Sequence, residues 1–373
     1  MQAFSFLLFA VGCVTGILFS GLDLTPIIGE STALVVRFNG RIDQNERGAK
    51  HGFFAICDKS GVILESSQDV DAFRESLALS TEQHTPQPPL NSVAFSYTPV
   101  AAQMLLIMER ALLGTLFSDQ VGRCGGGKGG CALGSVLPFD ASLRLGGQDW
   151  PPVGHTMVGG QRLQNAREAL EMAVQLGVPG DFAELGVWRG GVCIYAKAIL
   201  DLLCESGEGR REVLVFDAFQ DLPGYDWGGY TQYLSVSESL VRGAFDAYGV
   251  NTSGVKFIKG LFKDTLPSFR KARLAAGSKP ISVLRIDGNF YDSHQDALYY
   301  LYDFVPVGGV IIFDDFTHLT AERAWHDFQA DQDFSETATK LPDPDKNGAW
   351  FVKTVAVKVD MSKMRPAEDC NKQ

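Results

Sequence analysis

The stretch DFAELGVWRGGVCIYAKAILDLL, residues 181–203, joins a short apolar run to a longer apolar segment through a glycine-rich turn. The first run predicts a buried strand over 181–185, and the last segment predicts a helix through 194–203. Gly186, Gly190 and Gly191 lie between them, where glycine lets backbone approach a ligand and a helix N-terminus offers free N–H groups. A plain joint between a strand and a helix is the alternative. The spacing is not GxGxxG, which disfavours a dinucleotide.

The same order of strand and helix repeats through the rest of the chain. Four more strands are expected at 213–217, 255–260, 282–287 and 309–315, followed by helices at 237–248, 266–276, 296–304 and 321–329. RLQNAREALEMAVQL (162–176) predicts a helix before the first strand. This alternation is typical of an α/β fold with a doubly wound, mostly parallel sheet. SETATKL and AWFVKTVAVKV (335–341 and 349–359) predict an antiparallel hairpin at one edge.

The composition limits the class of partner. The chain has 373 residues, 45% of them hydrophobic, and a formal net charge of -11. No cluster of Lys and Arg suits a phosphate backbone, so we expect no nucleic-acid partner. The seven cysteines include no CxxC pair. Cys124 and Cys131 flank a glycine run, and the sequence leaves open a disulfide, a metal site or two unrelated thiols there.

The N-terminal third predicts three regions before the α/β domain. Residues 1–25 read as a hydrophobic signal or anchor segment, with no charged side chain before Asp23. An organelle-targeting or simply buried segment is the alternative. Residues 26–99 read as an extension with a few strands between 30 and 66 and a proline-rich linker from Thr81 to Pro99. A helix is expected over 101–117. The domain is expected over 100–358, followed by a polar tail over 359–373.

Carboxylates follow three of the predicted strands. Asp217 ends the second strand, where an acid can accept hydrogen bonds from ribose hydroxyls, with an Asp that caps a turn as the alternative. Asp287 ends the fourth strand, and Asp314 and Asp315 end the fifth. Three acids at one sheet edge repel each other and favour a hard cation such as Mg²⁺, with helix caps and solvated turns as the alternative. Phe262, after the third strand, offers an apolar face to a base or packs in the core.

Several stretches together resemble one family. VPGDFAELGVWRGG, VFDAFQDLP, SVSESLVRGAFDAYGV, KGLFKDTLP, VLRIDGNFYDS and VGGVIIFDDF are similar, in order and spacing, to the macrocin O-methyltransferase (TylF-like) family. Upstream, MLLIMERALLGTLF and DWPPVGHTMVGGQRLQN resemble its N-terminal helix and its lid segment. The resemblance covers about residues 100–355. It implies a class I methyltransferase fold with a seven-stranded, Rossmann-like sheet, and an enzyme that uses S-adenosylmethionine and Mg²⁺ to methylate a hydroxyl, typically on a sugar of a natural product.

The resemblance also implies roles for particular residues. Asp287, Asp314 and Asp315 look like the metal ligands. The expected cofactor-binding residues are Thr156, Met157, Glu184, Gly186, Val187, Asp217, Phe219, Ser237 and Phe262. Asp287 is also expected to accept the proton of the hydroxyl, with Tyr230, Tyr233 and His318 as weaker candidates for the base. His155 is expected to belong to the lid, and His294 and His326 to lie on helix surfaces.

Three positions depart from the family pattern. Asn289 stands where the family usually has a carboxylate, Leu261 stands where an aromatic residue is usual, and the loop 224–235 has no histidine. These departures motivate the second hypothesis, a catalytically inactive, membrane-tethered binding protein that keeps the fold. A nucleotide-dependent oxidoreductase is a third.

The expected partner is a small molecule with a hydroxyl group, whose identity the sequence does not give. Membrane association through residues 1–22 and homo-oligomerisation are left open. The expected location is the secretory pathway or a membrane, and otherwise the cytoplasm.

Overall fold

The computed structural model describes residues 33–34, 56–57, 62–63, 75–76, 87, 89–92, 95–122, 136–203, 210–220, 231–317, 320–342, 345 and 347–365. The segment 1–25, Cys124 and Cys131 lie outside the described residues, so the expectations for them stay predictions. Among the helices of the described part, none combines the length and the apolar character needed to cross a membrane.

Seven strands form one sheet in the order β12-β13-β11-β10-β7-β8-β9. Their bounds are β7 Asp181–Leu185, β8 Val213–Asp217, β9 Val255–Lys259, β10 Ile281–Ile286, β11 Val310–Phe313, β12 Thr339–Lys340 and β13 Ala349–Val352. Strands β7 to β11 pair in parallel, whereas β12 and β13 pair antiparallel at the edge. The central strands β7, β10 and β11 are buried along their whole length, as expected for parallel strands covered on both faces. The doubly wound sheet and its edge hairpin are confirmed.

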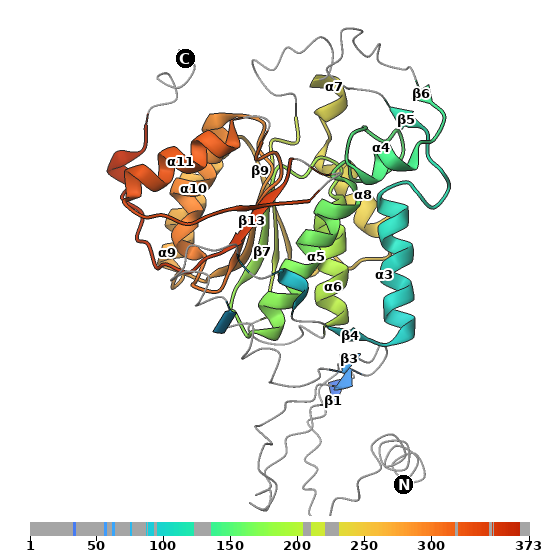
Figure 1. Ribbon diagram of the computed structural model, residues 1–373, viewed down its shortest axis with the longest axis horizontal. Helices are drawn as coiled ribbons and strands as arrows, with labels where there is room; N and C mark the ends of the chain where they lie inside the picture. The colour runs from blue at the N-terminus through green and yellow to red at the C-terminus, as the bar shows by residue number, and fades with distance from the viewer. Residues whose placement is uncertain are drawn as a thin grey trace, which may run out of the picture.

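Helices cover both faces of this sheet (Figure 1). On one side lie α3 (Pro99–Leu112), α5 (Gly159–Gln175), α6 (Gly191–Leu202) and α8 (Glu238–Ala247). The other side carries α9 (Phe262–Ala275), α10 (Tyr291–Leu301), the short η2 (Tyr302–Phe304) and α11 (Ala321–Gln332). Short helices α4 (Ala141–Leu145) and α7 (Thr231–Leu234) lie near the carboxyl ends of the strands. Each face therefore has its own apolar core.

The strand order reverses between β7 and β10. From β7 the chain moves outward through β8 to β9, and then returns to place β10 on the opposite flank of β7. Ligands of doubly wound sheets bind at such a reversal, beyond the carboxyl ends of the strands. In the register of these strands, Ile286 lies beside both Leu185 and Phe313. The residues that follow them, Gly186, Asp287 and Asp314, therefore leave the sheet side by side.

The N-terminal extension contributes only two-residue strands to the described part: β1 (Ala33–Leu34), β2 (Ile56–Cys57), β3 (Val62–Ile63) and β4 (Ser96–Tyr97). β1 pairs with β2 and β3 with β4, and β5 (Val121–Gly122) pairs with β6 (Val136–Leu137) beyond α3. These pairs are short ribbons separate from the main sheet.

The segment expected to be a linker is packed on the domain at three points. Gln87 donates to the carbonyl oxygen of Val352 at 2.9 Å and accepts from its N–H at 2.7 Å. Leu90, in the 3-10 helix η1 (Leu90–Ser92), is buried in the core that faces α5. The Tyr97 hydroxyl donates to Glu171 at 2.5 Å. The proline-rich composition of the segment does not predict these three anchoring side chains.

The start of the predicted polar tail is packed as well. Val359 is buried against the core on the α10 side, and the 3-10 helix η3 (Met361–Lys363) follows it. The carbonyl oxygen of Lys363 accepts from the Tyr299 hydroxyl at 3.0 Å, and Arg365 pairs with Asp331 at 3.1 Å.

Candidate active site

Three carboxylates meet where β10 and β11 end. Asp287 follows β10, and Asp314 and Asp315 follow β11. Each residue offers one carboxylate oxygen, and these atoms all lie within 4.8 Å of one another. The Asp287 side chain is 23% exposed, so the cluster is open to solvent on that side. A compact set of oxygen donors fits a hard divalent cation, and the predicted metal ligands are the residues brought together here.

Two buried arginines, Arg285 and Arg162, form ion pairs with the aspartate cluster. Arg285, 0% exposed on β10, contacts Asp314 through one guanidinium nitrogen and both Glu184 and Asp287 through another, with 2.9 Å to the Asp287 carboxylate. Because a buried carboxylate needs a positive partner, Arg285 explains how strand β10 tolerates an acid at its end.

Arg162, on the first turn of α5, contacts Asp314 from the other side. It also pairs with Asp315 at 3.7 Å and with Asp345, in the loop between β12 and β13, at 2.8 Å. The two guanidinium groups thus face five carboxylates, which leaves a formal excess of three negative charges. The arginines reduce the repulsion expected from the sequence without removing it, and a divalent cation would offset most of what remains.

Burial and the adjacent Asp314 carboxylate hold the pKa of Asp287 well above its usual range, although Arg285 opposes the shift. Glu184 lies one strand away and deeper. Its carboxylate accepts from the Cys193 thiol at 2.7 Å and contacts Arg285, and burial raises its pKa to about 7. Both oxygens of Glu184 therefore face protein groups. Its expected contact with the cofactor stays a prediction. In the structure its carboxylate forms an ion pair with Arg285.

The glycine turn after β7 lies directly against the three-aspartate cluster. Gly186 adopts a positive φ of +88°, and a Cβ there would lie 2.9 Å from the Asp287 carbonyl carbon and still closer to its oxygen. Trp188 also has a positive φ, +48°, which is strained for an aromatic residue. The next helix, α6, begins at Gly191, directly after this turn.

Asp217, at the end of β8, ties this turn in place. Its carboxylate accepts from the backbone N–H groups of Val187 at 2.8 Å, Trp188 at 3.3 Å and Phe219 at 2.9 Å. Burial raises the pKa of Asp217, and these N–H donors oppose that shift. Gly186, Val187, Asp217 and Phe219, four of the predicted cofactor residues, are thus gathered at the ends of β7 and β8.

Residues 149–157, the first part of the predicted lid segment, reach the start of α6 at His155 and Thr156. Thr156 is buried beside the first turn of α6, and a Cβ added at Gly191 would lie 2.8 Å from the Thr156 Cβ. Met157 follows it. Phe262 begins α9, and its ring lies 3.6 Å from where a Gly288 Cβ would be, next to the turn after Asp287.

Other predicted residues have different surroundings. Ser237 caps α8 by accepting from the Leu240 N–H at 3.3 Å, and its cofactor contact stays a prediction. The Tyr233 hydroxyl donates to the Pro151 carbonyl at 2.5 Å, so it fixes the lid. Tyr230 and His318 lie outside the described residues.

The expectation for His294 is wrong. Instead of lying on a helix surface, it is 0% exposed, with its ring near Phe313 and Nδ1 at 2.9 Å from the Phe290 carbonyl oxygen. Burial lowers its pKa to about 4. The histidine faces the sheet because α10 packs between α9 and α11, so most of its residues are buried. His326 is exposed, as expected.

This combination of fold and site defines a class I O-methyltransferase fold, and comparisons with known proteins agree. The family model of the macrocin O-methyltransferases (TylF) matches residues 131–353. The 8-demethyl-8-(2,3-dimethoxy-alpha-L-rhamnosyl)-tetracenomycin-C 4'-O-methyltransferase of Streptomyces olivaceus is 37% identical over 58% of this chain and 82% of its own length. Demethyldecarbamoylnovobiocin O-methyltransferase of Streptomyces niveus is 35% identical over 58% of this chain and 82% of its own length.

A solved structure gives the same answer. That of the O-methyltransferase NovP superposes with a TM-score of 0.58 and 32% identity, over 68% of this chain and all of that chain. The chain belongs to the TylF family of macrocin O-methyltransferases. Membership implies S-adenosylmethionine as the methyl donor.

Proposed function

We propose that this protein is an Mg²⁺-dependent O-methyltransferase that transfers a methyl group from S-adenosylmethionine to a hydroxyl group on a sugar of a small natural product. The observation that carries the proposal is the position of the three-aspartate cluster, directly beside the glycine turn that Asp217 holds by hydrogen bonds. The relatives named above, whose names give a rhamnosyl-tetracenomycin C and demethyldecarbamoylnovobiocin as their substrates, support the class of acceptor.

Asp287, Asp314 and Asp315 would hold the cation, with Arg162 and Arg285 keeping the carboxylates oriented. When bound, S-adenosylmethionine supplies an electrophilic methyl group, and Mg²⁺ supplies positive charge that lowers the pKa of an acceptor hydroxyl. Asp217 and the glycine turn would bind the donor, and Thr156 would exclude water from it. Asp287 would accept the hydroxyl proton as the methyl group leaves sulfur for oxygen, because its carboxylate is the part-exposed one beside that turn.

The test uses the full-length chain, methyl-labelled S-adenosylmethionine and a panel of glycosylated natural products, with methylated products read by mass spectrometry. We expect turnover that EDTA abolishes and excess Mg²⁺ restores. Asp315→Asn should lower kcat/KM by about 100-fold or more, as loss of a metal ligand does.

Asp303→Asn is the matched control, since Asp303 is also held by an arginine, Arg270 at 2.5 Å, but lies on η2 away from the cluster. Turnover that survives EDTA, or an Asp315→Asn variant as active as the control, would refute the metal role. Failure of calorimetry to detect S-adenosylmethionine binding to the wild-type chain would refute the function itself.

A further inference from the structure

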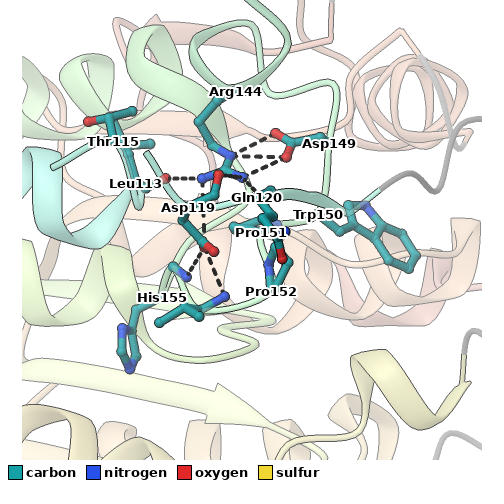
Figure 2. Close-up of polar contacts among 12 residues, drawn as sticks. Leu113, Thr115, Asp119, Gln120, Arg144, Asp149, Trp150, Pro151, Pro152 and His155 are labelled. Carbon is teal, nitrogen blue, oxygen red and sulfur yellow. Dashed lines mark hydrogen bonds and ion pairs between the residues drawn. The ribbon is translucent and has the colours of Figure 1, made fainter. Parts of the chain in front are cut away.

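One fully paired arginine lies outside the cluster described above. Arg144, in the last turn of α4, is 1% exposed, and its guanidinium grips the Asp149 carboxylate, with Nε at 2.8 Å from Oδ1 and Nη2 at 2.8 Å from Oδ2 (Figure 2). Asp149 is buried too and is the first of the lid residues. A two-point contact of this kind fixes direction as well as distance.

The remaining N–H groups of Arg144 reach two other parts of the chain. Nη1 donates to the carbonyl oxygen of Leu113, just after α3, at 2.8 Å. Nη2 donates to the carbonyl oxygen of Gln120 at 2.8 Å. One side chain therefore joins the end of α3, the turn after it and the start of the lid (Figure 2).

Asp119 extends this grip along the lid. Its carboxylate lies 3.8 Å from Arg144 Nη1 and accepts from the backbone N–H groups of Val153 and Gly154, both at 2.9 Å (Figure 2). The next residue, His155, donates its N–H to the Leu112 carbonyl oxygen at 2.7 Å. The lid is thus held to the end of α3 at successive residues.

The opposite side of the lid contacts the first residue of α6 and the glycine turn. The His155 carbonyl oxygen accepts from the N–H of Gly191, the first residue of α6, at 3.0 Å. Arg189, in the glycine turn, donates to the carbonyl oxygens of Pro151, Pro152 and Gly154 at 2.8–3.0 Å. The lid segment is therefore held on both sides, by the end of α3 and by the glycine turn.

We infer that Arg144, acting through Asp149 and Asp119, is a positioning residue that keeps the lid seated before the methyl donor binds. The inference rests on the proposed function, because it needs Thr156 and Met157 to face S-adenosylmethionine. The contacts of Arg144 described above reach neither the glycine turn nor the aspartate cluster. Arg144 therefore sets the fraction of protein molecules that can bind the methyl donor, and it does not affect the rate of methyl transfer. Apparent affinity falls in proportion to the fraction of molecules that are ready.

The experiment compares Asp119→Asn and Arg144→Lys with the wild-type chain. Asp119→Asn keeps the shape of the side chain and an acceptor oxygen but loses the charge that faces Arg144. Arg144→Lys keeps the charge but loses the two-point grip on Asp149. Both should keep the far-UV circular dichroism of the wild type, and Asp303→Asn is again the control. We expect the KM for S-adenosylmethionine, and its dissociation constant by calorimetry, to rise by about 10-fold or more, with kcat at saturating donor within about twofold of the wild type.

Hydrogen exchange separates positioning from general stability. In the unliganded variants the amides of Val153 and Gly154 should exchange at least about 10-fold faster than in the wild type, and saturating S-adenosylmethionine should restore their protection. Folded variants with wild-type donor affinity, or with lower kcat and unchanged KM, would overturn the inference. A wild-type chain that binds the donor without methylating any acceptor would refute the proposed acceptor class only, because donor affinity and exchange still test Arg144.

Discussion

Gly186→Ala tests how the glycine turn and the aspartate cluster depend on each other. Gly186 has a φ of +88°, and an added Cβ would lie 2.9 Å from the Asp287 carbonyl carbon, with the carbonyl oxygen nearer still. The obstacle is backbone between two central strands, so it has no flexible end that can rotate away. The substitution must push β7 and β10 apart at their carboxyl ends, where the glycine turn and the aspartate cluster begin.

The expected cost has two parts. The left-handed backbone costs an alanine about 1–2 kcal/mol, and forcing extra volume into packed structure costs about 1–3 kcal/mol. The sum is about 2–5 kcal/mol of unfolding free energy. Gly177→Ala is the matched control, because Gly177 has a φ of +66° and nothing within 4 Å of an added Cβ, so it carries the first cost alone.

Urea denaturation of both variants and the wild type measures these free energies, and calorimetry measures S-adenosylmethionine binding by the folded fraction. We expect Gly186→Ala to lose at least about 1 kcal/mol more than Gly177→Ala and to bind the donor at least about 10-fold more weakly. Equal losses in the two variants would show that the turn does not need close approach to Asp287, and the reasoning would fail.

Three further predictions concern other parts of the chain. Burial, with Asp292 nearby, raises the pKa of Asp296 to about 7, so the folded state holds this proton more tightly than the unfolded chain and stability falls as pH rises from about 4 to about 7. Asp296→Asn should remove that fall, which urea midpoints at pH 5 and pH 8 would show, and an unchanged pH dependence would contradict it. Burial, then Glu184, raises the pKa of the Cys193 thiol, so iodoacetamide should label Cys193 only after unfolding, as peptide mass spectrometry can check; labelling in the native protein would disprove the assignment. Gly191→Ala would place a Cβ 2.5 Å from the His155 carbonyl oxygen and should weaken donor binding about 10-fold or more while the fold persists, and wild-type affinity by calorimetry would argue against a seated lid.

The sequence predicts the sheet well because local patterns and topology rules act together. Each apolar run of β7 to β11 is followed by a helix, and parallel strands need such crossovers, so their carboxyl ends had to meet at one edge. That rule alone brings Asp287 beside Asp314. The edge hairpin is predicted from the turn residues PDPDKNG, which separate its two strand segments. The linker between Thr81 and Pro99 is harder, because a few anchoring side chains decide its packing.

The sequence does not reveal what neutralises the cluster. Arg162 stands in a helix that also carries Arg167 and Glu171, which pair with each other, whereas its own partner Asp314 is 152 residues away along the chain. Arg285 sits inside an apolar strand, so the strand pattern gives no sign of its ionic partners. Arg144 leaves no signal either, because its partners include backbone carbonyl oxygens, which any residue supplies. Pairing by tertiary contact leaves no periodic signal.

Gln87 has a consequence for how much of the chain is needed. β12 pairs with β13 at Ala349 and Trp350, so it ends before Val352, whose N–H and carbonyl oxygen point outward to the Gln87 amide instead. An uncovered strand edge is a template for pairing with another chain. A protein shortened to residues 131–353, the span of the family match, would lose this side chain together with α3 and would carry an open edge at the rim of its sheet. The Gln87 side chain thereby covers the part of the β13 edge that β12 leaves unpaired.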